Sequence, residues 1–262
     1  MDVFERSIKL HEELRGKLSV ENKLDIQSTE DLSLAYSPGV AAPCEEIYAH
    51  PEKVYDYTIK GNTVAIVSDG SAVLGLGNIG PHAAIPVMEG KAMLFKRFAG
   101  INGFPICLAT QKTEELIHII KNLAPVFGGI NLEDISSPRC FEVEEKLQDI
   151  GIPVFHDDQH GTAIVVLAAL MNYCRLTGRN LEDLKIVING AGAAGIAIAR
   201  YLGRRDPSAL RQRIVKEIIM CDTMGIIHRG RLGLEGIKQE LLGYTNPRNL
   251  SGTVEHALVG MD

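Results

Sequence analysis

The sequence is poor in the features that mark membrane, secreted and nucleic-acid-binding proteins. Its longest apolar run, 163–171, is well short of the roughly 20 residues that a membrane-spanning helix needs. The first residues are acidic and lack the basic-then-apolar order of a signal peptide. Its 27 Lys and Arg are outnumbered by 33 Asp and Glu in 262 residues, and this net charge of −6 does not suit a phosphate backbone. We therefore expect neither a membrane nor a nucleic acid as a partner.

Closely spaced cysteines are missing too. The five cysteines are scattered, show no Cys-x-x-Cys spacing and are odd in number. This usage predicts reduced thiols in the core of a cytoplasmic protein, with a redox or metal role as the alternative. The five are Cys44, Cys107, Cys140, Cys174 and Cys221.

What the sequence does contain is an alternation of short apolar runs with longer helical patterns. The runs predict strands at 63–68, 104–109, 129–132, 152–155, 184–188 and 217–221. The longer patterns predict helices at 83–98, 113–123 (with Thr113 as its cap), 137–150, 162–176, 194–202 and 234–242. This order predicts an α/β fold, with parallel sheets covered by helices on both faces, after about 60 helical and irregular residues.

The helix expected from Thr162 separates two such units. We therefore expect one domain over residues 1–160 and a second over residues 161–262. After the glycine-rich stretch near residue 190, only about 70 residues remain, roughly one half of a dinucleotide-binding fold. Residues 254–262 resemble the lead-in to a further strand, so the second domain is expected to be incomplete at its C-terminus.

The stretch 184–195 reads LKIVINGAGAAG and predicts a dinucleotide site. Gly190, Gly192 and Gly195 form G-x-G-x-x-G between an apolar strand and an apolar helix, and Ala193 and Ala194, between the last two glycines, are candidates for cofactor binding with them. The first glycine permits the tight turn, the second lets the backbone approach a pyrophosphate, and the third lets the helix pack against the strand. Exposed N–H groups at the helix start then face the anion. A tight turn without a ligand is the alternative.

Asp222 ends the next predicted strand and bears on the choice of nicotinamide cofactor. A carboxylate there accepts hydrogen bonds from the ribose 2′-hydroxyl and repels a 2′-phosphate, which favours NAD over NADP. Its spacing from the glycines is unusually long, and the inserted stretch 204–207 accounts for it. Arg229 and Arg231 lie beyond it and could hold a phosphate, so NADP stays possible. A second G-x-G-x-x-G, at 75–80, lies several residues beyond its strand and is interpreted as a substrate-side loop.

Carboxylates follow two other predicted strands. Glu133 and Asp134 end one of them, and Asp157 and Asp158 end the next. In a parallel sheet the carboxyl ends of the strands share one edge, where ligands bind. Acids crowded at that edge repel one another unless a cation lies between them, and oxygen-only ligation suits Mg²⁺ or Mn²⁺. Helix capping plus surface charge explains the same acids without a metal.

Two further residues are candidates for proton transfer. Lys91 lies in an otherwise apolar stretch, and a partly buried lysine has a lowered pKa that suits a general base. A surface lysine whose stem covers apolar neighbours is the alternative. Tyr36 precedes the Ser-Pro-Gly turn at 37–39, which would hold its phenol rigidly, whereas an ordinary core or surface tyrosine is the simpler reading.

Together these motifs resemble the malic enzymes, in particular the small bacterial and archaeal type. The matching stretches are 35–41, 73–81, 88–91, 130–135, 155–163 and the glycine turn. The resemblance implies an N-terminal substrate and metal domain followed by a Rossmann-type NAD-binding domain. It also implies oxidative decarboxylation of (S)-malate to pyruvate and CO₂ with reduction of NAD or NADP, a need for Mg²⁺ or Mn²⁺, and a homodimer or higher homo-oligomer.

The same resemblance gives roles to individual residues. Tyr36 would be the general acid that protonates the enol carbon, and Lys91 would be the general base that takes the hydroxyl proton. Asp157 would be an adjacent acid that supports the site. The metal ligands would be Glu133, Asp134 and Asp158, and residues 190–195 would hold the dinucleotide.

Three other functions stay open at this point. One is a malolactic reaction that yields lactate, and another is a catalytically inactive, truncated form acting as a binding or oligomerisation subunit. The third is a folate-type or amino-acid dehydrogenase with the same two-domain plan, which has no reason to keep the carboxylates. Because members of the family continue well beyond residue 262, we expect weak metal binding and slow malate turnover from this chain.

Overall fold

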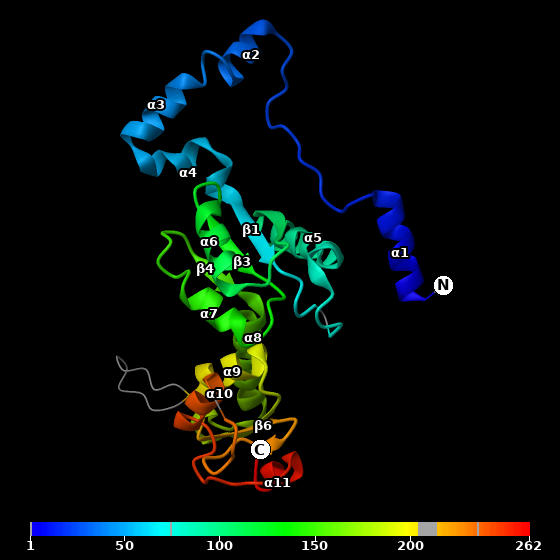
Figure 1. The fold of residues 1–262 in the computed structure, drawn as a ribbon, viewed down its shortest axis with the longest axis vertical. Coiled ribbons are helices and arrows are strands. Elements are labelled where there is room, and N and C mark those ends of the chain that lie inside the picture. The colour runs from blue at the N-terminus through cyan, green and yellow to red at the C-terminus, as the bar shows by residue number, and fades with distance from the viewer. Residues whose placement is uncertain (1, 74, 204–213, 235) are drawn as a thin grey trace. The chain divides into compact units, whose positions relative to one another are not determined.

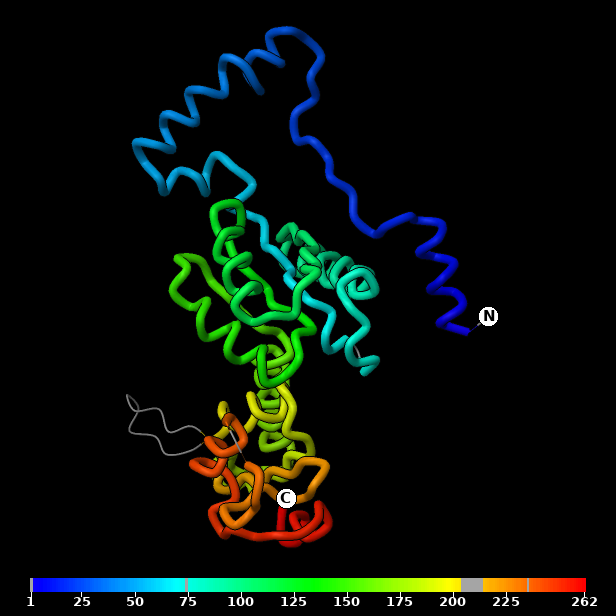
Figure 2. Tube along the Cα trace, viewed as in Figure 1, coloured from blue at the N-terminus to red at the C-terminus, as the bar shows by residue number. Residues whose placement is uncertain are grey.

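The computed structural model of the chain describes residues 2–73, 75–203, 214–234 and 236–262, and Figure 2 draws the others in grey. The chain forms two compact units. One comprises residues up to 135 together with 143–155, and the other comprises 136–142 together with 156–262. In the described part of the chain, no helix combines the length and the apolar character needed to cross a membrane.

A four-stranded sheet is the centre of the first unit. Its strand order is β2-β1-β3-β4, and β1 runs parallel to both of its neighbours. The strands are β1 (Thr63–Ser68), β2 (Asn102–Cys107), β3 (Gly129–Leu132) and β4 (Val154–His156). The helices between them are α5 (Gly80–Ala99), α6 (Thr113–Leu123) and α7 (Arg139–Glu145).

The strand order creates a topological switch point between β1 and β3. The chain leaves β1 through α5 toward β2, but it leaves β3 through α7 toward β4 on the other side. Because such crossovers are right-handed, α5 and α6 cover opposite faces of the sheet, as Figure 1 shows on the two sides of β1. In open α/β sheets, ligands bind beyond the carboxyl ends of the strands at such a switch point.

Close packing fixes α5 against this sheet. Ala84, Met88 and Ala92 recur every fourth residue, so they share one buried face of the helix, and Met88 and Ala92 pack against Ile66 of β1. Gly103 of β2 is needed for this approach, because a Cβ there would lie 2.8 Å from both the Cα and the Cβ of Ala92. The neighbouring Lys91 is thereby held in a fixed place near the carboxyl edge of the sheet.

The second unit is built on a three-stranded sheet of order β5-β6-β7 (the yellow to red part of Figure 1). β5 and β6 are parallel, whereas β7 pairs antiparallel with β6. Leu184, Leu202 and Ile218 form part of its core. Its elements are α8 (Asp157–Thr177), η3 (Leu181–Asp183), β5 (Lys185–Asn189), α9 (Ala193–Gly203), β6 (Glu217–Asp222), β7 (Gly225–Ile226), α10 (Ile237–Glu240), η4 (Leu241–Gly243) and α11 (Val254–Leu258).

The N-terminal segment is helical but has little packing of its own. None of the residues of its four α-helices is buried. At its end, Lys60 is 7% exposed and its Nζ donates to the carbonyls of Ala124 (2.7 Å) and Phe127 (2.6 Å), while burial lowers the pKa of its ammonium. The segment contains α1 (Val3–Leu14), α2 (Thr29–Ala35), α3 (Ala41–Ala49), η1 (Pro51–Lys53), α4 (Val54–Tyr57) and η2 (Ile59–Asn62).

The α/β class and the parallel four-stranded sheet are as predicted, and the strands at 63–68 and 129–132 and the helix at 113–123 match in full. Three helix predictions are wrong in length. The helix expected over 137–150 covers only 139–145, because Leu147 and Gln148 donate to carbonyls three residues back and so end it in tighter turns. The helix expected at 234–242 is reduced to α10, and the one expected from Thr162 already begins at Asp157.

Smaller corrections concern caps, the last residues and the cysteines. Thr113 is the first helical residue of α6, and Lys112 is its N-cap. The segment expected to lead into a strand begins instead with helix α11, and the antiparallel strand β7 had no signal in the sequence. The free thiols are not all in the core, because Cys44 is exposed and Cys107 is only partly buried.

Candidate functional site

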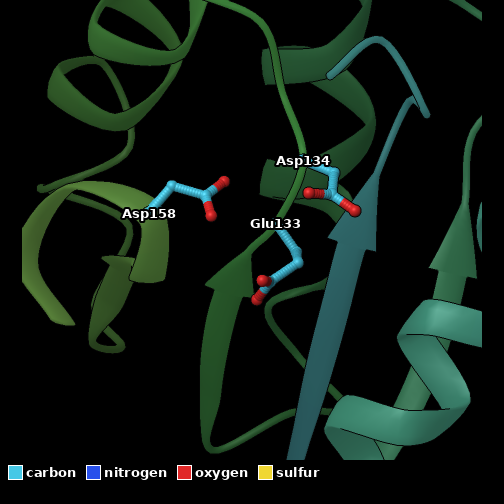
Figure 3. Close-up of side chains that lie close together, drawn as sticks. All are labelled: Glu133, Asp134 and Asp158. Carbon is cyan, nitrogen blue, oxygen red and sulfur yellow. The ribbon is translucent and has the colours of Figure 1, made fainter. Parts of the chain in front are cut away.

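Three carboxylates meet at the carboxyl edge of the four-stranded sheet. Glu133 and Asp134 follow β3 directly, and Asp158 is the second residue after β4, in the first turn of α8 (Figure 3). Each offers one oxygen, and these oxygens all lie within 4.8 Å of one another. Glu133 and Asp134 are 5% and 4% exposed, and Asp158 is partly buried. Sequence reasoning placed these three residues together, and the structure does so as well.

The backbone holds the first two acids firmly. The N–H of Glu133 donates to Val67 of β1 (2.9 Å), which extends the pairing of β1 and β3 by one residue. Asp134 adopts a left-handed conformation, with φ 54°, which aspartate tolerates better than most side chains. Its carbonyl accepts from Ala72 N–H (3.0 Å), which ties the loop after β1 to the same place. The acids therefore lie at the switch point between β1 and β3.

This donor set fits a hard divalent cation. Three carboxylates that are largely removed from water repel one another strongly, and a cation between them would relieve that repulsion. Oxygen-only ligation is what Mg²⁺ and Mn²⁺ prefer. The capping explanation fits less well, because His156 is the N-cap residue of α8 and Asp157 and Asp158 are already helical.

Lys91 points to these acids. It lies on α5, its side chain is 20% exposed, and its Nζ is 3.2 Å from Glu133 Oε2. Asn131 contacts the same atom, because its Nδ2 donates to Glu133 Oε2 at 2.8 Å. Lys96, one turn further along α5, is exposed and bonds Asn102 instead. Lys91 is therefore a member of the cluster and not a surface lysine.

Asn131 was missed by sequence reasoning, although a signal was present. Residues 131 and 133 are two apart along a strand direction, and positions i and i+2 share one face of a sheet. Asn131 is 4% exposed on β3, so its amide is committed to orienting Glu133. The signal was the spacing: a polar residue two positions before a candidate metal ligand, on a buried strand, lies on the same face of the sheet as that ligand.

The two remaining candidates, Tyr36 and Asp157, belong to different units of the chain. Tyr36 is the C-cap residue of α2 and is 69% exposed, and Figure 1 draws α2 and α3 well away from α5. The structure thus does not bring Tyr36 to Lys91 within one chain. Asp157 lies beside Asp158, but its carboxylate rests against Gly161, where a Cβ would overlap Asp157 Oδ1.

The loop at 75–80, which carries the second glycine pattern, folds back on itself. The N–H groups of Ile79 and Gly80 both donate to Gly70 O at 3.1 Å, and Asn78 exchanges two amide hydrogen bonds with Gln111 (3.0 and 2.9 Å). Gly80 then opens α5, a dozen residues after β1 ends. This is a closed loop beside the switch point and not a strand-to-helix turn.

The glycine turn of the second unit has the geometry that its motif predicts. Gly190 has φ 132° and its N–H donates to Cys221 O of β6 (2.9 Å). Gly192 is exposed, and a Cβ there would meet nothing within 4 Å. A Cβ on Gly195 would instead overlap Gly190 O, so α9 can pack this close to β5 only with glycine there. Ala193 and Ala194 lie in the first turn of α9, which begins one residue earlier than predicted.

Asp222 ends β6 next to this turn and is held by two cations. Its Oδ2 is 2.8 Å from Arg231 Nη2 and 2.7 Å from Lys238 Nζ, and its Oδ1 accepts from Met224 N–H at 2.9 Å. Burial raises the pKa of this carboxyl, but the hydrogen bonds from Arg231 and Lys238 outweigh it and hold the pKa well below the usual value. Lys238 had no signal in the sequence, because 16 residues separate it from Asp222.

Arg229 takes no part in this cluster in the described contacts: it is exposed, and its backbone N–H donates to Asn249 Oδ1. The insertion at 204–207, which was expected to explain the long spacing to Asp222, lies outside the described residues.

Comparison with known proteins decides the family. Residues 15–148 match the family described as malic enzyme, N-terminal domain, and residues 159–256 match malic enzyme, NAD binding domain. The chain belongs to the malic enzyme family. The resemblance inferred from the motifs is therefore confirmed.

Relatives within the malic enzyme family differ in cofactor and in reaction. Over its full length the chain is 50% identical to a bifunctional malic/malolactic enzyme of Bacillus subtilis and 51% identical to an NAD-dependent malic enzyme of Geobacillus stearothermophilus. It is 48% identical, over 92% of its length, to an NADP-dependent malic enzyme of Halomonas elongata. It covers 62%, 53% and 56% of these three proteins, so it spans little more than half the length of the curated relatives it matches.

The fold agrees with solved malic enzymes. A crystal structure of an NAD-dependent malic enzyme from Thermotoga maritima aligns with a TM-score of 0.90 at 46% identity, covering all of this chain and 67% of that one.

Proposed function

We propose that the chain catalyses the oxidative decarboxylation of (S)-malate to pyruvate and CO₂, with reduction of NAD or NADP and with Mg²⁺ or Mn²⁺ as the required metal. The observation that carries the proposal is the convergence of Lys91 on the carboxylates Glu133, Asp134 and Asp158. Family membership supports it. The functional division that we propose is a substrate and metal domain over residues 1–160 and an NAD-binding domain over residues 161–262.

The metal would be held by Glu133, Asp134 and Asp158. Bound there, a divalent cation would supply Lewis-acid chemistry at the 2-oxygen of malate, drawing electrons as the β-carboxylate departs. The chain's contribution is to hold the three acids close together, with Glu133 and Asp134 largely out of water. Asn131 positions Glu133 through its 2.8 Å hydrogen bond.

Lys91 is the proposed general base. Its amine takes the proton of the malate 2-hydroxyl as hydride passes to the nicotinamide, the chemistry that this cofactor supplies. The contact with Glu133 holds Nζ at the metal site before substrate binds. Loss of CO₂ leaves an enol, and Tyr36 is the proposed acid that returns a proton to its carbon. Asp157 is proposed to support the site from the first turn of α8.

The exposed position of Tyr36 is the reason to propose a homodimer or higher homo-oligomer. The helices α1 to α4 bury none of their residues, and the segment exposes apolar side chains such as Phe4, Ile8 and Leu34. Such surfaces mark interfaces between chains. We propose that this segment covers a second copy and that Tyr36 serves the acidic site of that copy.

The test is a malate assay with NAD and with NADP, in the presence of Mn²⁺ or of a chelator. Lys91→Ala is expected to lower kcat at least about a hundredfold, because general-base catalysis contributes that much, and yet to keep Mn²⁺ binding. Asp158→Ala is expected to lose both activity and Mn²⁺ binding, measured by electron paramagnetic resonance. Lys96→Ala, on the same helix, is the matched control. Metal-independent turnover, or a Lys91→Ala variant with normal kcat, would contradict the proposal.

The same assay separates the alternatives. Lactate as the product, with no net reduction of NAD, would show the malolactic reaction, which the name of the Bacillus subtilis relative includes. Binding of Mn²⁺ and NAD without turnover of malate would instead indicate a catalytically inactive binding or oligomerisation subunit.

A further inference from the structure

The end of β6 carries a charge cluster whose net sign is the opposite of what Asp222 alone suggests. One carboxylate is paired with one guanidinium and one ammonium, so the cluster has a net charge of +1. The Asp222 side chain is 7% exposed, that of Arg231 is 14% exposed and that of Lys238 is 39% exposed. The surface that a ligand meets is therefore cationic, and the anion lies beneath it.

The cluster lies beside the glycine turn. Asn189, the last residue of β5, is in register with Cys221, and the Gly190 N–H bonds the Cys221 carbonyl at 2.9 Å. Asp222 is the next residue. In a dinucleotide fold the strand after the glycine turn ends at the adenosine ribose, so this cluster is where a ribose 2′ substituent would lie.

The atoms of the cluster are arranged to accept an anion without losing their present bonds. Asp222 Oδ2 accepts hydrogen bonds from both Arg231 and Lys238, and Oδ1 accepts one from the Met224 N–H. Lys238 has three N–H donors and Arg231 has five, of which the described contacts use only part. A phosphate would find charged donors there, while Oδ1 keeps a lone pair for a plain 2′-hydroxyl.

We propose that Arg231 and Lys238 make the end of β6 a site for the 2′-phosphate of NADP, so that the chain accepts NADP as well as NAD. The proposal rests on the dinucleotide site of the proposed function. It reverses the sequence argument that Asp222 favours NAD over NADP: that argument requires an unpaired carboxylate, and in the structure the carboxylate is paired twice.

The test uses ligands that carry only the adenosine end. The full 262-residue chain is titrated by calorimetry with 5′-AMP, with 2′,5′-ADP and with NAD. The wild type is expected to bind 2′,5′-ADP at least as tightly as 5′-AMP. Lys238→Met is expected to weaken 2′,5′-ADP binding about tenfold, the loss of one charge-assisted hydrogen bond, with little change for 5′-AMP. Arg229→Met, which changes a nearby exposed arginine outside the cluster, is the matched control.

A second variant distinguishes a loss of the phosphate contact from a loss of folding, because it is expected to bind 2′,5′-ADP more tightly and not more weakly. Asp222→Asn keeps the shape of the side chain and removes the buried negative charge, so it is expected to tighten 2′,5′-ADP binding. Weaker binding of 2′,5′-ADP than of 5′-AMP to the wild type, or equal effects of Lys238→Met on both ligands, would overturn the proposal while leaving the nucleotide site intact. Binding of neither 5′-AMP nor NAD would instead overturn the nucleotide site itself.

Discussion

Gly195→Ala and Gly192→Ala test how the glycine turn works, because they add the same methyl group in opposite surroundings. At Gly195 the added carbon would lie well under 3.0 Å from the Gly190 carbonyl oxygen and 3.2 Å from Met220 Cε, whereas ordinary contacts are 3.4–4 Å. The oxygen belongs to the backbone and cannot move without opening the turn. At Gly192 nothing lies within 4 Å.

The magnitudes follow from these two environments. Overpacking costs about 1–3 kcal/mol, and at Gly195 we take the upper part of this range because the obstacle is backbone. The smaller entropy of an unfolded chain with alanine offsets about 0.4–1 kcal/mol of it. A net loss of about 2 kcal/mol corresponds to a fall of roughly 8 °C in Tm for a unit of about 110 residues. Gly192→Ala is expected to change stability by less than about 1 kcal/mol.

NAD affinity should distinguish the two variants in the opposite sense, because here Gly192→Ala is the variant that is impaired. Gly192→Ala folds normally but places a methyl group where the pyrophosphate approaches, so its Kd for NAD is expected to rise at least tenfold or so. Thermal unfolding followed by circular dichroism and NAD titration by calorimetry measure the two effects. A Gly195→Ala variant as stable as the wild type, or a Gly192→Ala variant with unchanged NAD affinity, would refute this account of the turn.

Two further predictions concern charge and assembly. Because the pKa of Asp222 is depressed below its ordinary 3.8 in the folded state, its stabilising effect is present above that pH and is lost as the pH falls through the lower folded value. In urea unfolding, the stability difference between wild type and Asp222→Asn should therefore shrink between pH 7 and pH 3, and a constant difference would contradict it. If Tyr36 serves a second copy, inactive Tyr36→Phe and Lys91→Ala proteins mixed after dissociation should regain roughly a quarter of wild-type activity, since half of the dimers are mixed and each has one intact site. No recovery in mixed dimers would count against a shared site.

Most helices and strands could be predicted from the residues of the element itself. The helix at 113–123 has apolar residues at helical spacing, and the strands at 63–68 and 129–132 are buried and apolar, so each element could be located from its own residues. The glycine turn was equally clear, because every role in the motif is a local backbone requirement. The acids after two strands were also foreseen, since parallel strands end at one edge.

The helix starts and ends depended on context that the sequence does not display. The helix predicted from Thr162 begins at Asp157 because two first-turn acids favour the positive end of the helix dipole directly after β4. The two-residue strand β7 exists only because β6 offers it an edge to pair with. Neither the start of α8 nor the strand β7 is marked by a periodic pattern of apolar residues in the sequence.

The sequence by itself determined which chemistry the chain carries, because motifs and strand ends are local and their residue types can be read directly. Only the tertiary structure decided which charges meet. Lys91 reaches Glu133 across 42 positions, and Lys238 reaches Asp222 across 16, through helix packing that no local pattern encodes. Charge interactions act through space, so the pairing that makes one lysine part of an acidic site, and that turns a lone carboxylate into a cationic cluster, exists only in the folded chain.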